Sequence, residues 1–253
     1  MKTIQLSSEV MVSDPCYSVP TWCQYKVKDV LPGEYCVNVF KTSNTGGWGN
    51  RCAALIAVHK DFLEDTLTWR TNNGADIGVD SGQCGIFSME TYRNDEVFQE
   101  KSNFAYGIDK EGDQWYGHMC DRTLKDEQWG TYENGVVSSS GFGDGSYRLL
   151  LAKHNGKVVG LAIDFFVLNL KSGDFNHIMA GELVELNKNN MIQSTIKTEI
   201  RVSCNGYEVW CSFDGGQSSQ FHGRYSSMED AVRETTILKG HFKLLGDLKT
   251  TKQ

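Results

Sequence analysis

The dipeptide Asn155-Gly156 stands between two apolar runs and constrains the fold more than any other feature of the sequence. The first run, SYRLLLAK, covers residues 146–153, and the second, KVVGLAIDFFVLNL, covers residues 157–170. Asn-Gly between such runs is a strong hairpin signal, because a type I′ turn needs positive φ at both central residues. Both runs are apolar on both faces, which is typical of strands buried inside a sheet. We therefore expect an antiparallel hairpin at the centre of a β-rich core.

The N-terminal segments predict further antiparallel strands. Residues 2–12 alternate loosely between apolar and polar side chains, which predicts one strand. The run EYCVNVFK (34–41) predicts another strand, and RCAALIAVH (51–59) predicts its return partner. Asp80-Ser81-Gly82 interrupts an apolar strand over residues 77–87. The chain is thus expected to be mainly β, with antiparallel sheets arranged as a sandwich.

Two later stretches have weaker patterns. Residues 90–135 are polar and rich in aromatic and acidic side chains, so we expect loops with one short helix. Residues 171–195 predict a turn and a connection. No periodic apolar pattern in either stretch identifies a long element.

The C-terminal part predicts a separate small module of three strands and a helix, which makes the whole chain β or α+β. TIKTEIRVSC and YEVWCSF flank Asn205-Gly206 and predict a second hairpin, and QFHGRYS predicts a third strand. Ser226 or Ser227 then precedes a helix, with an acid at capping-box spacing. We place a domain boundary near residue 190, which gives a β-rich domain of 1–190 and a module of 191–253.

The net charge of the chain limits the classes of partner that it is expected to bind. The formal net charge is −7, which argues against nucleic acid and anionic membranes, because phosphate contacts need Lys and Arg. The C-terminal module holds eight basic and seven acidic residues, so it lacks the excess of positive charge that nucleic-acid binding needs. No stretch approaches the ~20 apolar residues of a membrane span. The start, MKTIQLSSEV, lacks a long apolar run, so we expect no signal peptide and a cytoplasmic location.

Eight cysteines occur without a CxxC pair and without zinc-ligand spacing. We expect reduced thiols that behave as small hydrophobic side chains, rather than disulfides or metal ligands. The eight residues are Cys16, Cys23, Cys36, Cys52, Cys84, Cys120, Cys204 and Cys211.

Six short segments, in order, resemble a bacterial and phage domain family of unknown function. They are Asp14-Pro15, PGEY (32–35), RCAALIAVH (51–59), GVDSGQ (78–83), SSGFGDGSY (139–147) and GKVVGLAIDF (156–165). The resemblance covers about residues 10–170 and leaves the C-terminal module outside it. It implies a shared fold and a bacterial or phage origin, in the host cytoplasm if viral, and brings no activity, cofactor or substrate.

Four aspartates are the main candidate site. Asp80 and Asp144 lie in glycine-rich turns, Asp14 precedes a proline, and Asp164 lies inside an apolar strand. If the turns fold over the end of the 157–168 strand, the carboxylates converge and bind Mg²⁺ or Ca²⁺, or act as general acid and base. In the alternative, Asp80 and Asp144 form Asx-turns, and Asp164 accepts hydrogen bonds from the backbone of those turns. Both interpretations stay open, and the metal and the cofactor stay unassigned.

Ser81 and Trp210 complete the set of candidate binding residues. Ser81 follows Asp80, but no Gly-x-Ser-x-Gly motif is present, so we name no catalytic residue. The histidines have no H-x-x-x-H spacing for a metal. Trp210 lies on the strand face opposite to Tyr207, where we expect it either to contact a partner or to pack under the following loop.

Two functions from different classes follow. The first is a non-enzymatic binding protein, a phage accessory factor that engages a host protein or a small signal molecule; its oligomeric state is open. The alternative is a metal-dependent hydrolase that uses Asp80, Asp144 and Asp164. Because Asp164 lies in an apolar strand, we also expect Asp164→Ala to destabilise the chain more than Asp109→Ala or Asp113→Ala.

Overall fold

The computed structural model describes residues 1–42, 45, 48–104, 111–168, 170–180, 197–203, 206–213 and 218–233. For residues 73–75, 197–203, 210–213 and 218–223 it describes the backbone alone. The chain divides into two compact units, one of residues 1–42 and 50–190, the other of residues 43–49 and 191–253. The described residues contain no helix that is long and apolar enough to cross a membrane.

The larger unit contains a six-stranded antiparallel sheet in the order β1-β4-β5-β11-β10-β6. Its strands are β1 (Lys2–Leu6), β4 (Gly33–Thr42), β5 (Arg51–His59), β6 (Trp69–Val79), β10 (Gly145–His154) and β11 (Lys157–Asp164). The two central strands, β5 and β11, are buried at every residue after their first, because both faces of the sheet are covered.

A five-stranded antiparallel sheet in the order β3-β2-β7-β9-β8 faces the first sheet. Its strands are β2 (Val10–Ser13), β3 (Tyr25–Val27), β7 (Gln83–Ser88), β8 (Trp129–Tyr132) and β9 (Gly135–Ser139). One hydrophobic core joins the two sheets: Leu55 and Leu161 from the first lie in the same buried cluster as Val12 and Ile86 from the second. The predicted mainly β, sandwich-like fold is confirmed.

The predicted hairpin is confirmed, with β11 at the centre of the sheet and β10 between β11 and the edge strand β6. β10 and β11 pair antiparallel, and β11 also pairs with β5. Asn155 and Gly156 have φ of 47° and 78°, the positive values that a type I′ turn requires. The predicted pairing of residues 34–41 with 51–59 is likewise confirmed, as β4 with β5.

The prediction of one strand over residues 2–12 is wrong, because two strands in different sheets share this segment. β1 lies in the six-stranded sheet and β2 in the five-stranded sheet. The bend between them is held by Ser7, whose amide donates to Ser88 Oγ at 3.1 Å and whose hydroxyl donates to the Glu9 carbonyl at 2.8 Å. The interruption at Asp80-Ser81-Gly82 has the same effect, because β6 and β7 belong to different sheets.

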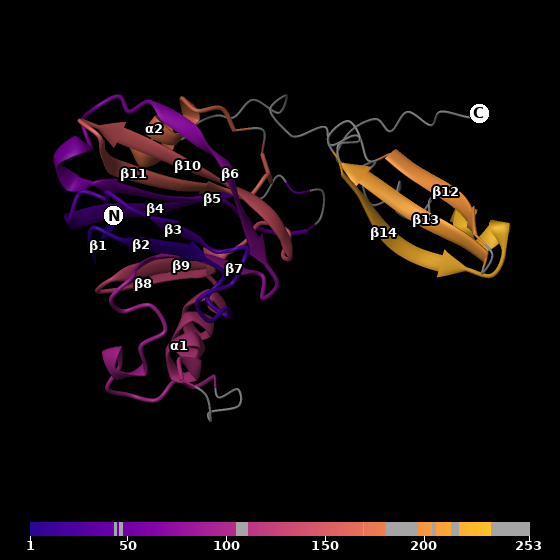
Figure 1. Cartoon of the computed structure of the whole chain (residues 1–253), viewed down its shortest axis with the longest axis horizontal. Helices are drawn as coiled ribbons and strands as arrows, with labels where there is room; N and C mark the ends of the chain where they lie inside the picture. Colours follow the sequence, from indigo (N-terminus) through magenta and orange to yellow (C-terminus); the bar gives the residue numbers. More distant parts are fainter. Residues whose placement is uncertain are drawn as a thin grey trace. The chain divides into compact units, whose positions relative to one another are not determined.

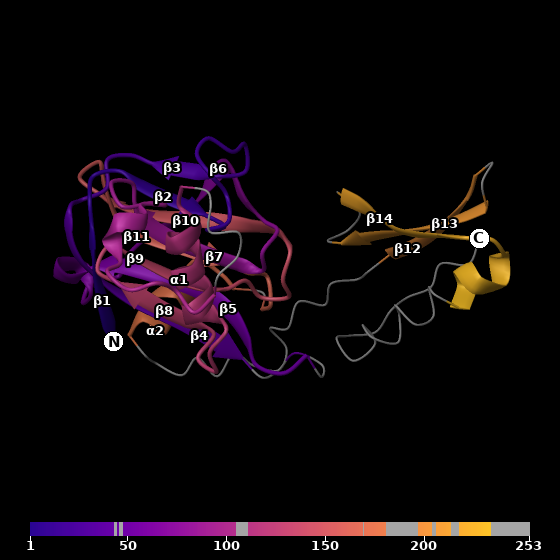
Figure 2. The same cartoon turned by 90° about the horizontal axis from the view of Figure 1, so that it is seen from below.

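Helices cover the outer faces of both sheets (Figure 1). α2 (Asp174–Met179) lies on the six-stranded sheet, where Asn176 Oδ1 accepts from Trp69 Nε1 at 2.9 Å. α1 (Asp113–Thr123) lies against β8 and β9 of the five-stranded sheet, which Figure 2 shows from below. A second buried cluster fills the space under α1 and includes Met11, Phe87, Trp115 and Met119.

The stretch 90–135, predicted as loops with one short helix, contains the helix α1. It also contains the strand β8, the first residue of β9 and the short 3-10 turn Asp95–Val97, which the pattern did not predict. Likewise, the stretch 171–195, predicted as a turn and a connection, contains α2. The six cysteines whose side chains are described are free thiols, and five of them are buried. Burial raises the pKa of the Cys52 thiol to about 11, so it stays protonated near neutral pH.

The smaller unit contains the predicted three strands and helix. β12 (Lys197–Ser203), β13 (Gly206–Phe213) and β14 (Ser218–Tyr225) form an antiparallel sheet in that order. The helix begins after Ser227, and its described part covers residues 228–233. Ser227 Oγ accepts from the Asp230 amide at 3.1 Å, which is the N-cap bond that the sequence predicts.

Candidate functional site

Asp14 is buried and uses both carboxylate oxygens to hold the turn between β6 and β7. Its Oδ2 accepts from the amides of Asp80 and Ser81 at 2.8 and 2.7 Å. Its Oδ1 accepts from Ser81 Oγ at 2.7 Å and from the Cys16 amide at 2.9 Å. Four hydrogen bonds satisfy this carboxylate, so its arrangement is that of a structural residue that fixes two loops.

The Ser81 hydroxyl is committed to Asp14, and Asp80 is exposed. A nucleophilic serine needs a hydrogen-bond acceptor that is available as a general base. The Asp14 carboxylate is instead committed to four hydrogen bonds that hold two loops together. Burial raises the pKa of the Tyr17 hydroxyl well above its usual range, and the Asp80 carboxylate adds to this shift.

The two glycine-rich turns lie together, which is the condition that the metal-site interpretation required. The Ser140 amide donates to the Gly82 carbonyl at 3.0 Å, which joins the 80–82 turn to the 140–145 turn. A Cβ atom on Gly141 would lie 2.8 Å from the Phe165 carbonyl oxygen, so this turn also lies against the end of β11.

The carboxylates of these turns and of β11, however, do not converge on one site. Asp144 is exposed, and Asp164 is fully buried and bonded to Arg148. In the described part of the chain, no group of three or more His, Cys, Asp or Glu side chains is arranged to hold a metal ion.

Asp164 is held by its own strand and by the neighbouring one. Its Oδ2 accepts from an Arg148 guanidinium nitrogen at 2.5 Å, and its Oδ1 accepts from the Phe166 amide at 2.9 Å. Burial raises the pKa of the Asp164 carboxyl above its ordinary value, while the Phe166 amide and Arg148 oppose this shift. The Asx-turn pattern, from a carboxylate to the amide two residues on, therefore occurs at Asp14 and Asp164, where the sequence placed it at Asp80 and Asp144.

Trp210 lies on β13, where its backbone is paired with Glu199 of β12 and Phe221 of β14. Its side chain is outside the described part of the chain. The prediction that it contacts a partner stays a prediction.

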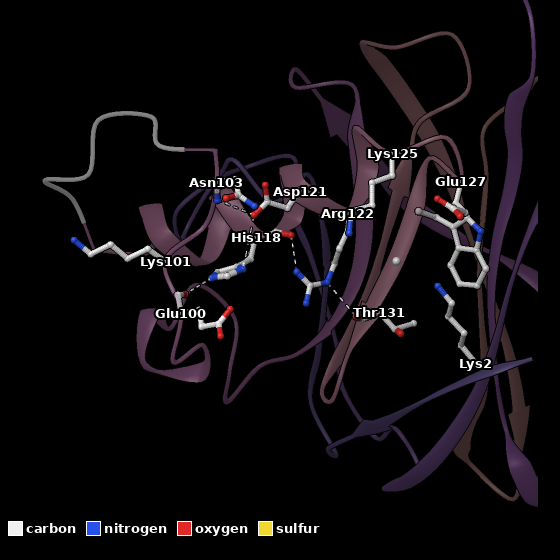
Figure 3. A pocket seen from close by; sticks show the side chains of 12 residues that line it. Lys2, Glu100, Lys101, Asn103, His118, Asp121, Arg122, Lys125, Glu127 and Thr131 are labelled. Atoms are coloured by element: carbon white, nitrogen blue, oxygen red, sulfur yellow. Dashed lines mark hydrogen bonds and ion pairs between the residues drawn. The ribbon is translucent and has the colours of Figure 1, made fainter.

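A polar pocket of about 490 Å³ lies beside α1 (Figure 3). We call it the α1 pocket. Side chains from α1, β1 and β8 and from the segment 100–104 surround it. Its lining consists of Lys2, Glu100, Lys101, Asn103, His118, Asp121, Arg122, Lys125, Glu127, Trp129, Gly130 and Thr131.

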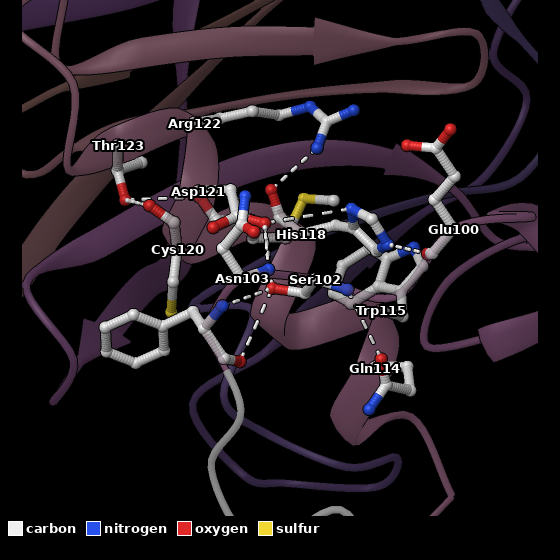
Figure 4. A network of polar contacts seen from close by, with 12 residues as sticks. Glu100, Ser102, Asn103, Gln114, Trp115, His118, Cys120, Asp121, Arg122 and Thr123 are labelled. Carbon is white, nitrogen blue, oxygen red and sulfur yellow. Dashed lines mark hydrogen bonds and ion pairs between the residues drawn. The ribbon is translucent and has the colours of Figure 1, made fainter.

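One wall of the α1 pocket is a hydrogen-bonded network that ties the segment 100–104 to α1 (Figure 4). Asp121 Oδ2 accepts from Ser102 Oγ at 2.8 Å and from the Asn103 amide at 3.1 Å. His118 Nε2 lies 2.8 Å from the Glu100 carbonyl oxygen, and a carbonyl only accepts, so this nitrogen carries a proton and donates. The His118 ring also stacks on Phe98 with a centroid separation of 4.0 Å.

Gly117 is the reason why the segment 100–104 approaches α1 so closely. A Cβ atom at this position would lie 2.6 Å from both the Phe104 carbonyl oxygen and Ser102 Oγ. A glycine in mid-helix costs helix stability relative to alanine, and here the contact with the neighbouring segment requires it.

Arg122 is fixed in the pocket wall by backbone carbonyls. Its Nε donates to Thr131 O at 3.0 Å, and one terminal nitrogen donates to His118 O at 2.7 Å. The guanidinium carbon lies 5.1 Å from the centre of the Phe98 ring. Burial lowers the pKa of Arg122, yet this side chain remains charged near neutral pH because the pKa of a guanidinium ordinarily lies far above neutral.

The charges of the α1 pocket differ from those of the whole chain. Among the described residues of the lining, Lys2, Lys101, Arg122 and Lys125 oppose three acidic side chains, which is an excess of one positive charge in a chain of net charge −7. The Lys2 ammonium lies 4.3 Å from the centroid of the Trp129 ring, which is a cation–π contact.

The sequence interpretation missed the α1 pocket, although a signal was present. His118, Asp121 and Arg122 have the i, i+3, i+4 spacing that places side chains on one helix face. That spacing is informative only once a helix is recognised over residues 113–123, and the prediction of one short helix somewhere in residues 90–135 did not place it there.

Comparisons of the chain with protein-family models, curated proteins and solved structures found no match in any of the three. The resemblance to the bacterial and phage family therefore stays a prediction.

Proposed function

We propose that this chain is a non-enzymatic binding protein whose α1 pocket binds a small polar molecule that carries an anionic group. The observation that carries the proposal is the fixed, positively charged wall of this pocket. Arg122 is already oriented by two backbone carbonyls, and Lys101 and Lys125 lie at the same opening.

The size and rigidity of the α1 pocket support binding of a small molecule. Its volume of about 490 Å³ lies within the range of ~300–1,000 Å³ that is usual for ligand pockets. The bonds of Asp121 to the segment 100–104 hold the wall before any ligand arrives. Because less conformational freedom is then lost on binding, a prearranged wall strengthens affinity.

The polar groups of the network favour binding over catalysis. Acyl transfer by a hydroxyl needs a general base, usually an imidazole, that is free to take its proton. Here the His118 Nε2 proton is directed at the Glu100 carbonyl, and the Asp121 oxygen that accepts from Ser102 Oγ also accepts from the Asn103 amide. These groups hold the wall together instead of forming a nucleophile and base pair.

The biological setting that we propose comes from the resemblance of residues 10–170 to the bacterial and phage family. A phage accessory factor that binds a small anionic signal molecule of its host, in the host cytoplasm, combines this resemblance with the chemistry of the pocket. A host protein that docks through the same positive opening is the other partner class that the experiment below separates.

Calorimetric titration of the purified full chain tests the proposal. The probes are nucleoside monophosphates, cyclic nucleotides, sugar phosphates and acidic amino acids at fixed ionic strength, since salt screens exposed charges. We expect at least one probe to bind with a Kd below 1 mM. The double variant Lys101→Glu with Lys125→Glu should weaken this binding at least tenfold.

Lys28→Glu is the control, because it makes at an exposed residue outside the α1 pocket the charge change that each of the two pocket substitutions makes. It should leave the Kd within twofold of the unmodified chain. The proposal fails if no probe binds, or if Lys28→Glu weakens binding as much as the pocket variant does. Binding of a host protein that the pocket variant abolishes, in the absence of small-molecule binding, assigns the opening to protein docking and also overturns it.

A further inference from the structure

A second pocket lies where β6, an edge strand, departs from regular pairing with β10. The register of the two strands pairs Arg148 with Asp76 and Leu150 with Thr71. Four residues of β6, numbers 72–75, thus lie opposite the single residue Leu149. Such a bulge redirects side chains, and bulges are common beside binding sites. A pocket of about 530 Å³ opens at this bulge, and we call it the bulge pocket.

Hydrogen-bond donors dominate the lining of the bulge pocket. Arg70 is paired with Leu151, so these two side chains share a face of the sheet, and Lys153 shares it by alternation. Trp69 lies on the other face, against Phe175 of α2. The described residues of the lining include no acid; they are Thr68, Arg70, Thr71, Asn72, Leu151 and Lys153.

The polar groups of this pocket lack partners within the described residues. Arg70 and Lys153 form no ion pair there, in contrast to Lys60 and Lys157, which pair with acids. Asn72 Nδ2 is shielded from solvent and has no hydrogen-bond partner in the described part of the chain. An unpaired buried donor is costly to a folded protein, so an acceptor from a ligand would relieve this cost.

We propose that the bulge pocket binds an oxyanion of the phosphate type, either free phosphate or a phosphate monoester of a small molecule. The Arg70 guanidinium offers a planar fork of donors that matches two phosphate oxygens. The Lys153 ammonium adds a second positive charge, and Asn72 Nδ2 donates a neutral hydrogen bond. This site shares no residue with the α1 pocket, so it does not depend on the function proposed for that pocket.

Nuclear magnetic resonance of the full chain labelled with ¹⁵N tests the site with inorganic phosphate as the probe. Chloride keeps the ionic strength constant during the titration. We expect the side-chain amide resonances of Asn72 to shift and to saturate, together with the Arg70 side-chain Nε resonance. Asn72→Asp identifies the amide resonances by removing them. If neither resonance moves at 20 mM phosphate, the proposal is wrong.

Arg70→Ala and Lys153→Ala should each weaken phosphate binding at least tenfold, because each removes one charge from the lining. Lys28→Ala, an exposed lysine outside this pocket, is the matched control and should change the Kd less than twofold. Equal affinity of all three variants and the unmodified chain would mean that the anion binds elsewhere, which overturns the proposal.

A parallel titration with glycerol 3-phosphate separates the two sources of the oxyanion. Binding at least tenfold tighter than that of inorganic phosphate assigns the pocket to a phosphate monoester. Binding as tight as that of inorganic phosphate, or weaker, assigns it to free phosphate. The Lys101→Glu with Lys125→Glu variant should bind phosphate as the unmodified chain does, so failure at one pocket is distinguishable from failure at the other.

Discussion

At the scale of single residues, the buried carboxylates of this protein act as structural acceptors. Asp14 joins the loop after β2 to the turn before β7, and Asp164 joins β11 to β10 and to the Phe166 amide. In each case the carboxylate replaces water as the acceptor for donors that the fold has buried. A buried charge is tolerated where hydrogen bonds and an opposite charge compensate its desolvation.

Asp164→Ala should lower the free energy of unfolding by about 2–4 kcal/mol, because it leaves Arg148 without its ion-pair partner and the Phe166 amide without an acceptor. Chemical denaturation measures this directly. Asp144→Ala is the control, since Asp144 is exposed and should change stability by less than ~0.5 kcal/mol. Equal effects of the two substitutions would contradict the structural role of Asp164.

The structure refines the controls that the sequence suggested for Asp164. Asp109 lies outside the described residues. Asp113 lies in the first turn of α1 and forms a half-buried pair with Arg93 at 3.4 Å. Asp113→Ala therefore removes an interaction of its own, and Asp144 makes the better comparison.

The partner of Asp164 was not predictable from the hairpin alone. The turn pairs His154 with Lys157 and Lys153 with Val158, and continuing that register would place Arg148 opposite Ile163. An irregularity after Lys153 leaves Val159 unpaired, so that Ala152 pairs with Gly160 and Arg148 lies opposite Asp164. The sequence correctly indicated that Asp164 is buried and needs a partner, but a one-residue shift in register decided which one.

At the scale of elements, prediction succeeded where local chemistry decides the structure. The Asn155-Gly156 turn and the two flanking apolar runs are sufficient to specify the β10–β11 hairpin. α1 was harder, because glycine and aromatic residues weaken its helix propensity. Its formation depends on tertiary contacts, such as Trp115, which is fully buried under the helix. No local pattern reports such contacts.

The hairpin strands should be among the slowest segments in native-state hydrogen exchange. β11 is paired on both sides, with β10 and with β5, and its residues from Val158 onward are buried. Exchange of their amides should therefore require global unfolding. The edge strand β1 is the internal control, because it pairs with β4 alone in the six-stranded sheet and should exchange faster. Exchange from β11 as fast as that from β1 would contradict the central place of the hairpin.

At the scale of the whole molecule, the sequence predicted the fold class better than the assignment of strands to sheets. Alternating apolar runs and tight turns indicated antiparallel sheets, and the core confirms the sandwich. The polar bend at residues 7–9 and the turn at residues 80–82 move the chain from one sheet to the other. A turn signal shows that a strand ends, but the sheet that receives the next strand depends on distant pairings.

The division of the chain into two compact units suggests a test by truncation. Both pockets are lined by residues between 2 and 153, and both sheets of the sandwich end before residue 165. A chain of residues 1–190 should therefore unfold cooperatively on heating, bind phosphate and bind the ligand of the α1 pocket with Kd values within twofold of the full chain. A fragment of residues 191–253 should remain largely unfolded, since ~60 residues without a disulfide or a metal bury little core.

Circular dichroism melts and calorimetry of both truncated chains give the comparison. A truncated chain 1–190 that aggregates, or that melts without cooperativity, would mean that the sandwich depends on the C-terminal module for its stability. If it folds and loses ligand binding more than tenfold, the module contributes directly to binding, and Trp210 becomes the first residue to substitute. Retained folding with retained binding instead assigns the binding function of the chain to the sandwich and its covering helix α1.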